Sequence, residues 1–197
     1  IYTVDGMDAV KYGFEYTVTP YSIDERKITN TCRTGVYFCG ATKGREREIV
    51  SFYTRSNAEG IETSMDIICT DENIKKMIGS AERGVRLRNK NDYLLYPEVL
   101  SRSLDYSCIL EIVQKNQSAL TLRAYEAVCY NRKLLTNNKT ILKFPYYNEK
   151  YMQYFENIDD IDWKWINNMD NVDYGYKGDF SPDILLNKIN NKLLIGR

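Results

Sequence analysis

The stretch YPEVLSRSLDYSCILEIV, residues 96–113, marks a change in the hydrophobic pattern of the chain. Apolar residues recur on one face at steps of three or four: Leu100, Leu104, Cys108, Ile109, Ile112 and Val113. This spacing predicts a helix, and Pro97 is typical of a first helical position. The same spacing over 120–128 predicts a second helix, packed on the first as a hairpin. Shorter helices are expected over 151–155 and 161–169, and a last helix after Ser181 with a Leu-rich docking face.

The residues before this stretch predict short strands instead. β-branched and aromatic residues at partly alternating positions mark 14–18, 36–39, 48–53 and 61–68, with a short helix over 70–78 and a strand or loop over 83–88. We therefore expect an α+β fold, with an antiparallel β-rich part over 1–92 followed by a helical part over 93–197. One continuous α+β domain is the alternative.

The chain contains no His among its 197 residues. This removes the commonest general base, the usual partner of a nucleophilic Ser or Cys, and a frequent metal ligand. The five cysteines are widely spaced without a CxxC pair, which is typical of reduced thiols, although Cys32 and Cys39 could meet across a hairpin. A nucleophilic cysteine needs a lowered pKa, and Cys32, beside Arg33, is the one cysteine with a cation next to it in the sequence. The sequence predicts no cofactor and no metal site.

Composition limits the partners of the chain. The net charge is zero, so any nucleic acid or acidic surface would have to bind a local patch. No apolar run approaches the roughly 20 residues that cross a bilayer, and we expect a soluble protein without a membrane span. The chain begins at Ile1 rather than Met, as a processed or trimmed product would.

The strongest local charge is a basic cluster of Arg83, Arg86, Arg88 and Lys90. In an extended segment Arg86, Arg88 and Lys90 point to one side, where they could bind phosphates or an acidic protein surface. The simpler interpretation is a solvated strand edge that discourages aggregation.

An acidic region follows, with eight carboxylates between Glu156 and Asp183. The DxD pattern of Asp160 and Asp162 could bind Mg²⁺ or Mn²⁺, whereas a carboxylate at a helix N-terminus is the simpler interpretation. Trp163 and Trp165 lie two positions apart, so on a helix one faces the core and the other can contact a protein partner.

Two family resemblances fall on one stretch. Residues 12–16, YGFEY, followed by residues 32–38, CRTGVYF, resemble the N-terminal module that precedes ankyrin repeats in giant-virus proteins. This resemblance implies a viral protein-interaction module without catalysis. The composition is also rich in Asn, Lys, Ile and Tyr, as AT-rich genomes of large DNA viruses encode.

The second resemblance concerns residues 35–39, GVYFC, which are similar to a strand of poly-ADP-ribose polymerase-type transferases. Those enzymes bind NAD through a His, which this chain lacks, and usually polarise the ribose with a Glu.

The leading hypothesis is a non-catalytic, viral protein-interaction or structural module, intracellular and located in the cytoplasm or the virion. The first alternative is a carboxylate-dependent enzyme, either a degenerate ADP-ribosyltransferase-like protein or a metal-dependent nuclease or transferase. The second is a nucleic-acid-binding protein that uses the Arg83–Lys90 cluster.

Overall fold

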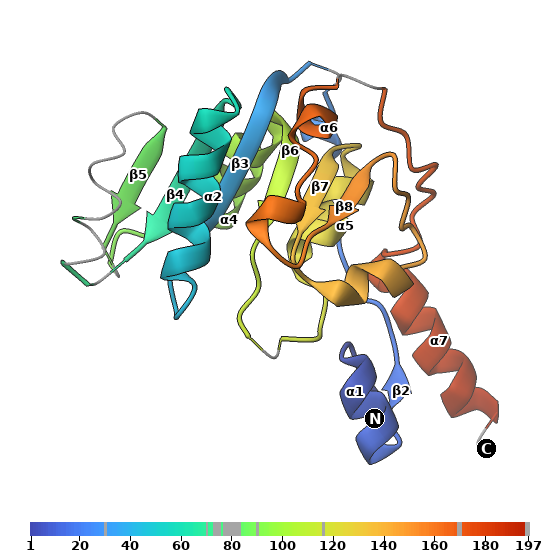
Figure 1. Cartoon of the computed structure of the whole chain (residues 1–197). Coiled ribbons are helices and arrows are strands. Elements are labelled where there is room, and N and C mark those ends of the chain that lie inside the picture. Colours follow the sequence, from blue (N-terminus) through green and yellow to red (C-terminus); the bar gives the residue numbers. More distant parts are fainter. Residues whose placement is uncertain are drawn as a thin grey trace.

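The computed structural model describes residues 1–29, 31–69, 71, 72, 76, 84–89, 91–115, 117–168 and 171–195. Its centre is a six-stranded sheet in the order β5-β4-β3-β6-β7-β8, and every neighbouring pair of strands is parallel (Figure 1). The strands are β3 (Arg33–Ala41), β4 (Thr63–Ile68), β5 (Val85–Arg88), β6 (Tyr106–Glu111), β7 (Lys133–Thr136) and β8 (Met152–Tyr154).

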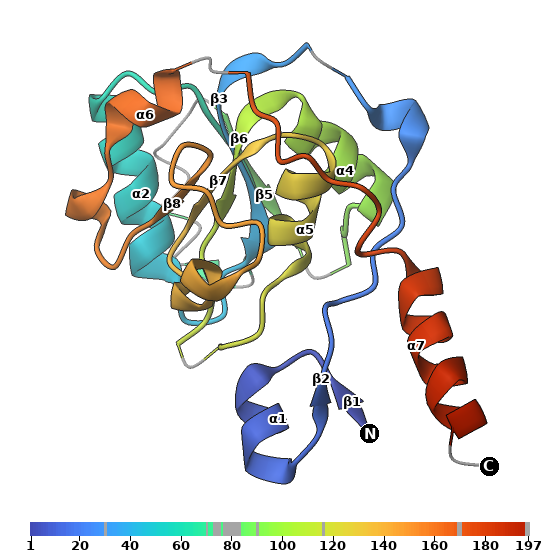
Figure 2. The ribbon, with the colours of Figure 1, turned by 90° about the vertical axis from the view of Figure 1, so that its right-hand side faces the viewer.

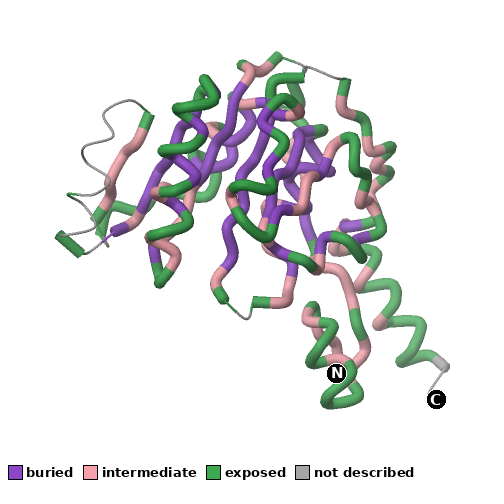
Figure 3. The backbone as a smooth tube through the Cα atoms, viewed as in Figure 1, coloured by how far each residue is buried: buried purple, intermediate pink, exposed green. Residues whose placement is uncertain are grey.

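Helices cover both faces of this sheet (Figure 2). On one face lie α2 (Glu46–Ala58) and α6 (Trp163–Asn167), and on the other α4 (Tyr96–Leu104) and α5 (Leu122–Cys129). Among the described residues, the connections also contain the 3-10 helices η1 (Glu25–Lys27), η2 (Lys139–Lys143) and η3 (Ile158–Asp160). The sheet is therefore buried on both sides, as parallel sheets generally are (Figure 3).

Alternate residues of each strand enter two different cores. Val36 and Phe38 of β3 pack with Phe52 of α2, whereas Ile109 of β6 packs with Leu100 and Val128 from the opposite helices. Each face thus buries its own set of apolar side chains, which is the main favourable contribution to folding.

The prediction of an antiparallel β-rich part followed by a helical part is wrong, because the sheet is parallel and takes strands from both sides of residue 92. Residues 48–53, expected as a strand, lie in α2, where Ile49, Phe52 and Tyr53 form one buried face. Residues 106–111, expected as part of a helix, form β6, and 151–155 contain β8. Short apolar runs fit both periods, so only the neighbouring strands decide between them.

Other expected elements have clearer outcomes. The helix over 120–128 corresponds to α5, and the helix after Ser181 is α7 (Pro182–Ile195). The helix expected over 70–78 falls largely outside the described residues.

All five cysteines are free, so Cys32 and Cys39 form no disulfide.

The two ends of the chain extend together from the core (Figure 2). At the N-terminus, β1 (Tyr2–Thr3) pairs in parallel with β2 (Glu15–Tyr16) around α1 (Gly6–Tyr12). Glu15 forms ion pairs with Lys188 and Lys192 of α7, which connects the two ends.

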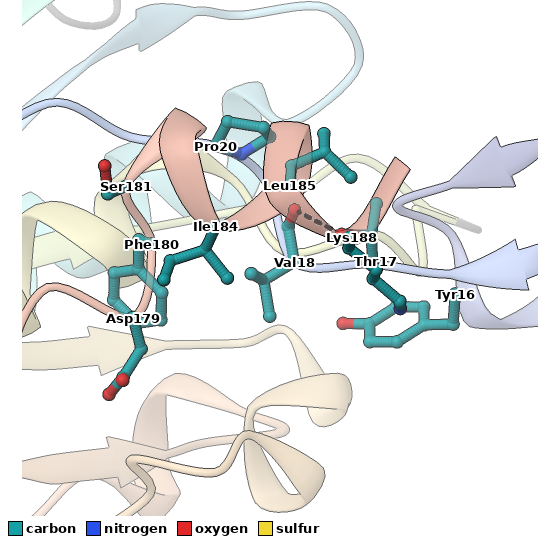
Figure 4. A pocket seen from close by; sticks show the side chains of 10 residues that line it. All are labelled: Tyr16, Thr17, Val18, Pro20, Asp179, Phe180, Ser181, Ile184, Leu185 and Lys188. Atoms are coloured by element: carbon teal, nitrogen blue, oxygen red, sulfur yellow. Dashed lines mark hydrogen bonds between the residues drawn. The ribbon is translucent and has the colours of Figure 1, made fainter. Parts of the chain in front are cut away.

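The Leu-rich face of α7 is not docked along its length. Leu186, Leu193 and Leu194 are exposed, and the first turns of α7 border a pocket of about 250 Å³ against the segment after β2. Figure 4 shows Ile184 near Val18 in this pocket. The apolar contacts of α7 are therefore concentrated near its N-terminal end, while Lys188 and Lys192 hold its later turns to Glu15.

Two glycines allow close approach at the start of the sheet. A Cβ on Gly35, whose φ is +142°, would lie 2.4 Å from the carbonyl oxygen of Glu62. A Cβ on Gly84, at φ +88°, would lie 2.2 Å from the carbonyl oxygen of Thr63. Any side chain at either position would push β4 away from its neighbours.

We expect Gly35→Ala to lower the free energy of unfolding by about 1 to 3 kcal/mol more than Gly175→Ala. Gly175 also has a positive φ, of +62°, but a Cβ there would meet no atom within 4 Å, so it measures the cost of a positive φ in open space. Urea unfolding of both variants measures the difference, and equal losses would show that the close approach to Glu62 is not limiting.

Candidate functional site

The order of the strands locates the candidate site. The chain proceeds outward from β3 to β4 and β5, then returns to the other side of β3 and proceeds outward again through β6, β7 and β8. Open parallel sheets bind ligands beyond the carboxyl ends of the strands where the order reverses, which here is between β3 and β6. We therefore consider the loops that follow these two strands.

The loop after β3 has an unusual backbone. Lys43 has a φ of +45°, which is uncommon for a residue with a side chain, and Gly44 follows at φ +82°. Arg45 holds this loop because its guanidinium donates hydrogen bonds to the carbonyl oxygens of Ala41, Thr42 and Ile112. Since Ile112 directly follows β6, Arg45 connects the two sides of the strand reversal, and Lys43 is exposed there.

The end of β6 carries a buried carboxylate. Glu111 accepts hydrogen bonds from the hydroxyls of Thr121 and Thr136, and Thr121 in turn accepts one from the backbone N–H of Arg123 at the start of α5. Burial raises the pKa of Glu111 despite these hydrogen bonds. Glu111 therefore fixes the N-terminus of α5 to the carboxyl ends of β6 and β7.

A second buried pair lies on α5 itself. The guanidinium of Arg123 binds Oε2 of Glu126, a residue with no exposed surface. Oε1 of Glu126 has no hydrogen-bond donor in good geometry among the described residues, although the Tyr96 hydroxyl is near enough to favour the charged carboxylate. Burial nevertheless raises the pKa of Glu126. Since Glu126 has no exposed surface, this pair lies inside the protein and is not accessible to a ligand.

A pocket of about 660 Å³ opens at this same end of the sheet, between α1 and the loops after β6 and β7. Lys11 of α1 and Lys139 and Lys143 of η2 line it, together with Ser118. Ser118 also donates a hydrogen bond of 2.6 Å to Asp5, the N-cap of α1. The volume is typical of a small-molecule site. Met7 and Val10 of α1 contribute apolar lining, and the three ammonium groups favour an anionic group on the ligand.

The basic cluster predicted from the sequence lies elsewhere. Arg86 and Arg88 of β5 do point to one side, but both bind the buried carboxylate of Asp66, with N–O distances of 2.8 to 2.9 Å. Arg83 and Lys90 lie outside the described residues. The predicted binding of nucleic acid or protein by this cluster stays a prediction.

Asp66 is the centre of a larger cluster. Arg102 of α4 and the Tyr37 hydroxyl also donate to it, at 3.1 and 2.9 Å. Burial alone would raise the pKa of Asp66, but the hydrogen bonds from Arg86, Arg88 and Tyr37 outweigh burial and hold this pKa well below its ordinary value. Asp66 is therefore ionised in the folded protein.

The two tryptophans and the DxD pattern have structural contacts. Trp163 is buried against Phe52 of α2, with ring centroids 5.4 Å apart. Trp165 is half-buried and donates to the carbonyl oxygen of Lys150. Asp160 accepts from the backbone N–H of Asn157, and Asp162 is the N-cap of α6. Within the described part of the chain, no cluster of Cys, Asp and Glu could hold a metal ion.

Sequence reasoning missed most residues at the carboxyl edge. Arg45, Glu111, Arg123 and Glu126 fall in segments without a recognised motif. One available signal was a charged residue within an otherwise apolar run, as Glu111 is in CILEIV, residues 108–113.

In the part of the chain that the structure describes, no helix has the length and apolarity that a membrane span requires.

Comparison with solved structures supports this architecture. The fold is similar to that of AviGT4, a glycosyltransferase involved in avilamycin A biosynthesis, with a TM-score of 0.54 and 9% identity over 84% of this chain and 52% of that one. It is also similar to TarM, with a TM-score of 0.63 and 16% identity over 96% of this chain and 42% of that one. No protein-family model and no curated protein matches the sequence. The chain spans about half the length of the two structures.

These likenesses correct the functional prediction. The prediction of a non-catalytic, viral protein-interaction module is contradicted, because the solved structures with a similar fold include a glycosyltransferase. The comparison agrees better with the first alternative, a carboxylate-dependent enzyme.

We expect Asp66→Asn to lower the free energy of unfolding by about 3 to 5 kcal/mol, because three guanidinium groups would lose their shared counter-charge. Glu62→Gln is the matched control, since Glu62 is exposed and its pair with Arg33, at 3.5 Å, is worth at most about 1 kcal/mol. Chemical denaturation measures both, and similar losses would contradict a central role for Asp66.

The raised pKa of Glu111 predicts that the stability of the folded protein depends on pH. Because its folded-state pKa lies above the ordinary value of 4.5, its contribution to stability is complete below pH 4.5 and is lost as the pH rises through the raised pKa. The stability of wild type relative to Glu111→Gln should therefore fall with rising pH, by about 1.4 kcal/mol per unit of pKa difference. Urea unfolding between pH 4 and 8 tests this, with the exposed Glu149→Gln variant expected to follow wild type throughout.

Proposed function

We propose that this chain binds the nucleoside diphosphate part of an activated sugar and acts in a glycosyltransferase. The observation that carries the proposal is the reversal of strand order between β3 and β6, which brings the Lys43–Arg45 loop and the N-terminus of α5 to one edge. The fold likeness to AviGT4 supports the choice of glycosyl transfer among the activities of such sheets.

The charges at this edge fit a diphosphate. The N-terminus of α5 presents the positive end of its helix dipole at this edge. Lys139 and Lys143 supply cations to the pocket at the same edge, and the exposed Lys43 lies on the loop after β3. A diphosphate would thus find cations and a helix N-terminus at one edge of the sheet.

In the proposed reaction, the bond between the sugar C1 and the β-phosphate oxygen breaks, and the nucleoside diphosphate leaves with the electron pair. The acceptor oxygen forms a new bond to C1 and loses its proton to a base. Cations placed around the diphosphate stabilise the charge that develops on this leaving group. The acceptor site is a further proposal, because the chain spans about half the length of the matched structures.

Calorimetric titration with UDP, GDP, ADP and CDP, and with the matching monophosphates, tests the proposal. At least one diphosphate should bind more tightly than its monophosphate, and affinity should fall with salt. Lys139→Ala combined with Lys143→Ala should weaken that binding by about tenfold or more, because two charge contacts are lost.

Lys150→Ala is the matched control, because Lys150 is exposed and precedes β8 at the opposite edge of the sheet. It should bind the diphosphate as wild type does. The proposal would be overturned if no diphosphate bound at millimolar concentration, or if both lysine variants weakened binding equally.

A further inference from the structure

A second polar pocket lies at the amino edge of the sheet, opposite the proposed nucleotide site. It has a volume of about 180 Å³ and is lined by Arg33, Ser64, Arg86, Arg102, Asp105 and Tyr106. Arg33 and Tyr106 are the first residues of β3 and β6 and are paired in register. The pocket is therefore separate from the loops that follow the strands.

The arginines of this pocket exceed what Asp66 can neutralise. Asp66 has no exposed surface and accepts hydrogen bonds from three guanidinium groups and one hydroxyl. A carboxylate offers about four lone-pair positions, so these four donor groups fully occupy it. Three positive charges thus share one buried negative charge. Arg88 also pairs with Asp92, at 3.4 Å, so the three guanidinium groups and two carboxylates retain an excess of about one positive charge.

Donors on two of these arginines remain available. No described residue accepts a hydrogen bond from Nη1 of Arg86, or from Nε and Nη2 of Arg102. Their side chains are 40% and 35% exposed, whereas Arg88, the third partner of Asp66, is only 15% exposed. Arg86 and Arg102 therefore present unused N–H groups to the pocket.

The remaining charges around the pocket partly offset one another. Arg33 stacks on the ring of Tyr106 and pairs with Glu62, while Asp105 is the one carboxylate in the lining. The lining itself contains three guanidinium groups and one carboxylate. Guanidinium forks match the oxygens of phosphate, and a pocket of this volume is smaller than most sites for whole nucleotides.

We propose that this amino-edge pocket binds a phosphate dianion, either free or as the terminal group of a phosphate monoester. Two phosphate oxygens would accept from the unused N–H groups of Arg86 and Arg102, and Arg33 would supply a third cation. The ligand would bind the folded chain and not the unfolded one, because only folding brings these arginines together. It should therefore stabilise the folded protein by mass action.

The test is thermal unfolding of the full chain with inorganic phosphate and with glucose 1-phosphate, each against sodium chloride at equal ionic strength. We expect a saturable rise in Tm with at least one of the two, and the tighter ligand identifies the source of the phosphate. Arg102→Gln and Arg33→Gln should each weaken the apparent affinity by about tenfold or more. Asp105→Asn should strengthen it, because a like charge is removed.

Two further variants locate the effect. Arg26→Gln, at a side chain 89% exposed and outside the pocket, should leave the phosphate response unchanged. The double variant Lys139→Ala with Lys143→Ala should also retain it, since those lysines belong to the carboxyl-edge pocket. The proposal would be overturned if phosphate produced no specific rise in Tm, or if the rise were undiminished in Arg102→Gln. It would also be overturned if the double lysine variant lost the rise in Tm, because the phosphate would then bind at the carboxyl edge.

Discussion

Parallel pairing of all six strands is the constraint on which the rest of the structure depends. Parallel neighbours cannot be joined by a tight hairpin, so each connection must cross a face of the sheet, usually through a helix. The crossings cover both faces and place every loop that follows a strand at one edge. The Lys43–Arg45 loop, the N-terminus of α5 and η2 meet there for this reason, although they are distant in the sequence.

The same constraint explains the buried charges. A sheet covered on both sides has few positions at which a charged residue can reach water, so each such residue needs partners inside the protein. Arginines from β5 and α4 neutralise Asp66, and the hydroxyls of Thr121 and Thr136 donate hydrogen bonds to Glu111. Arg132 is buried as well, and it donates to the carbonyl oxygens of Leu104, Tyr130 and Thr29.

These partners come from different elements, which gives the charges a structural role beyond their solvation. Asp66 fixes β5 and α4 to β4, and Glu111 fixes α5 to the ends of β6 and β7. Arg45 connects the loop after β3 to the end of β6. Both edges of the sheet are thus held by polar contacts, while the two apolar cores determine how the helices pack. The two proposed ligand sites lie at these two edges.

The sequence by itself determined the local features: α5 and α7, the convergence of Arg86 and Arg88 on one side of an extended segment, and the absence of histidine chemistry. These depend on periodicity and composition, which act over a few residues. Only the tertiary structure decided that residues 106–111 form a strand and that 48–53 form a helix, because short apolar runs satisfy either period until neighbouring strands supply hydrogen bonds. It alone decided the candidate sites as well, since Glu111, Thr121 and Thr136, like Asp66 and Arg102, meet only once the strands align in parallel.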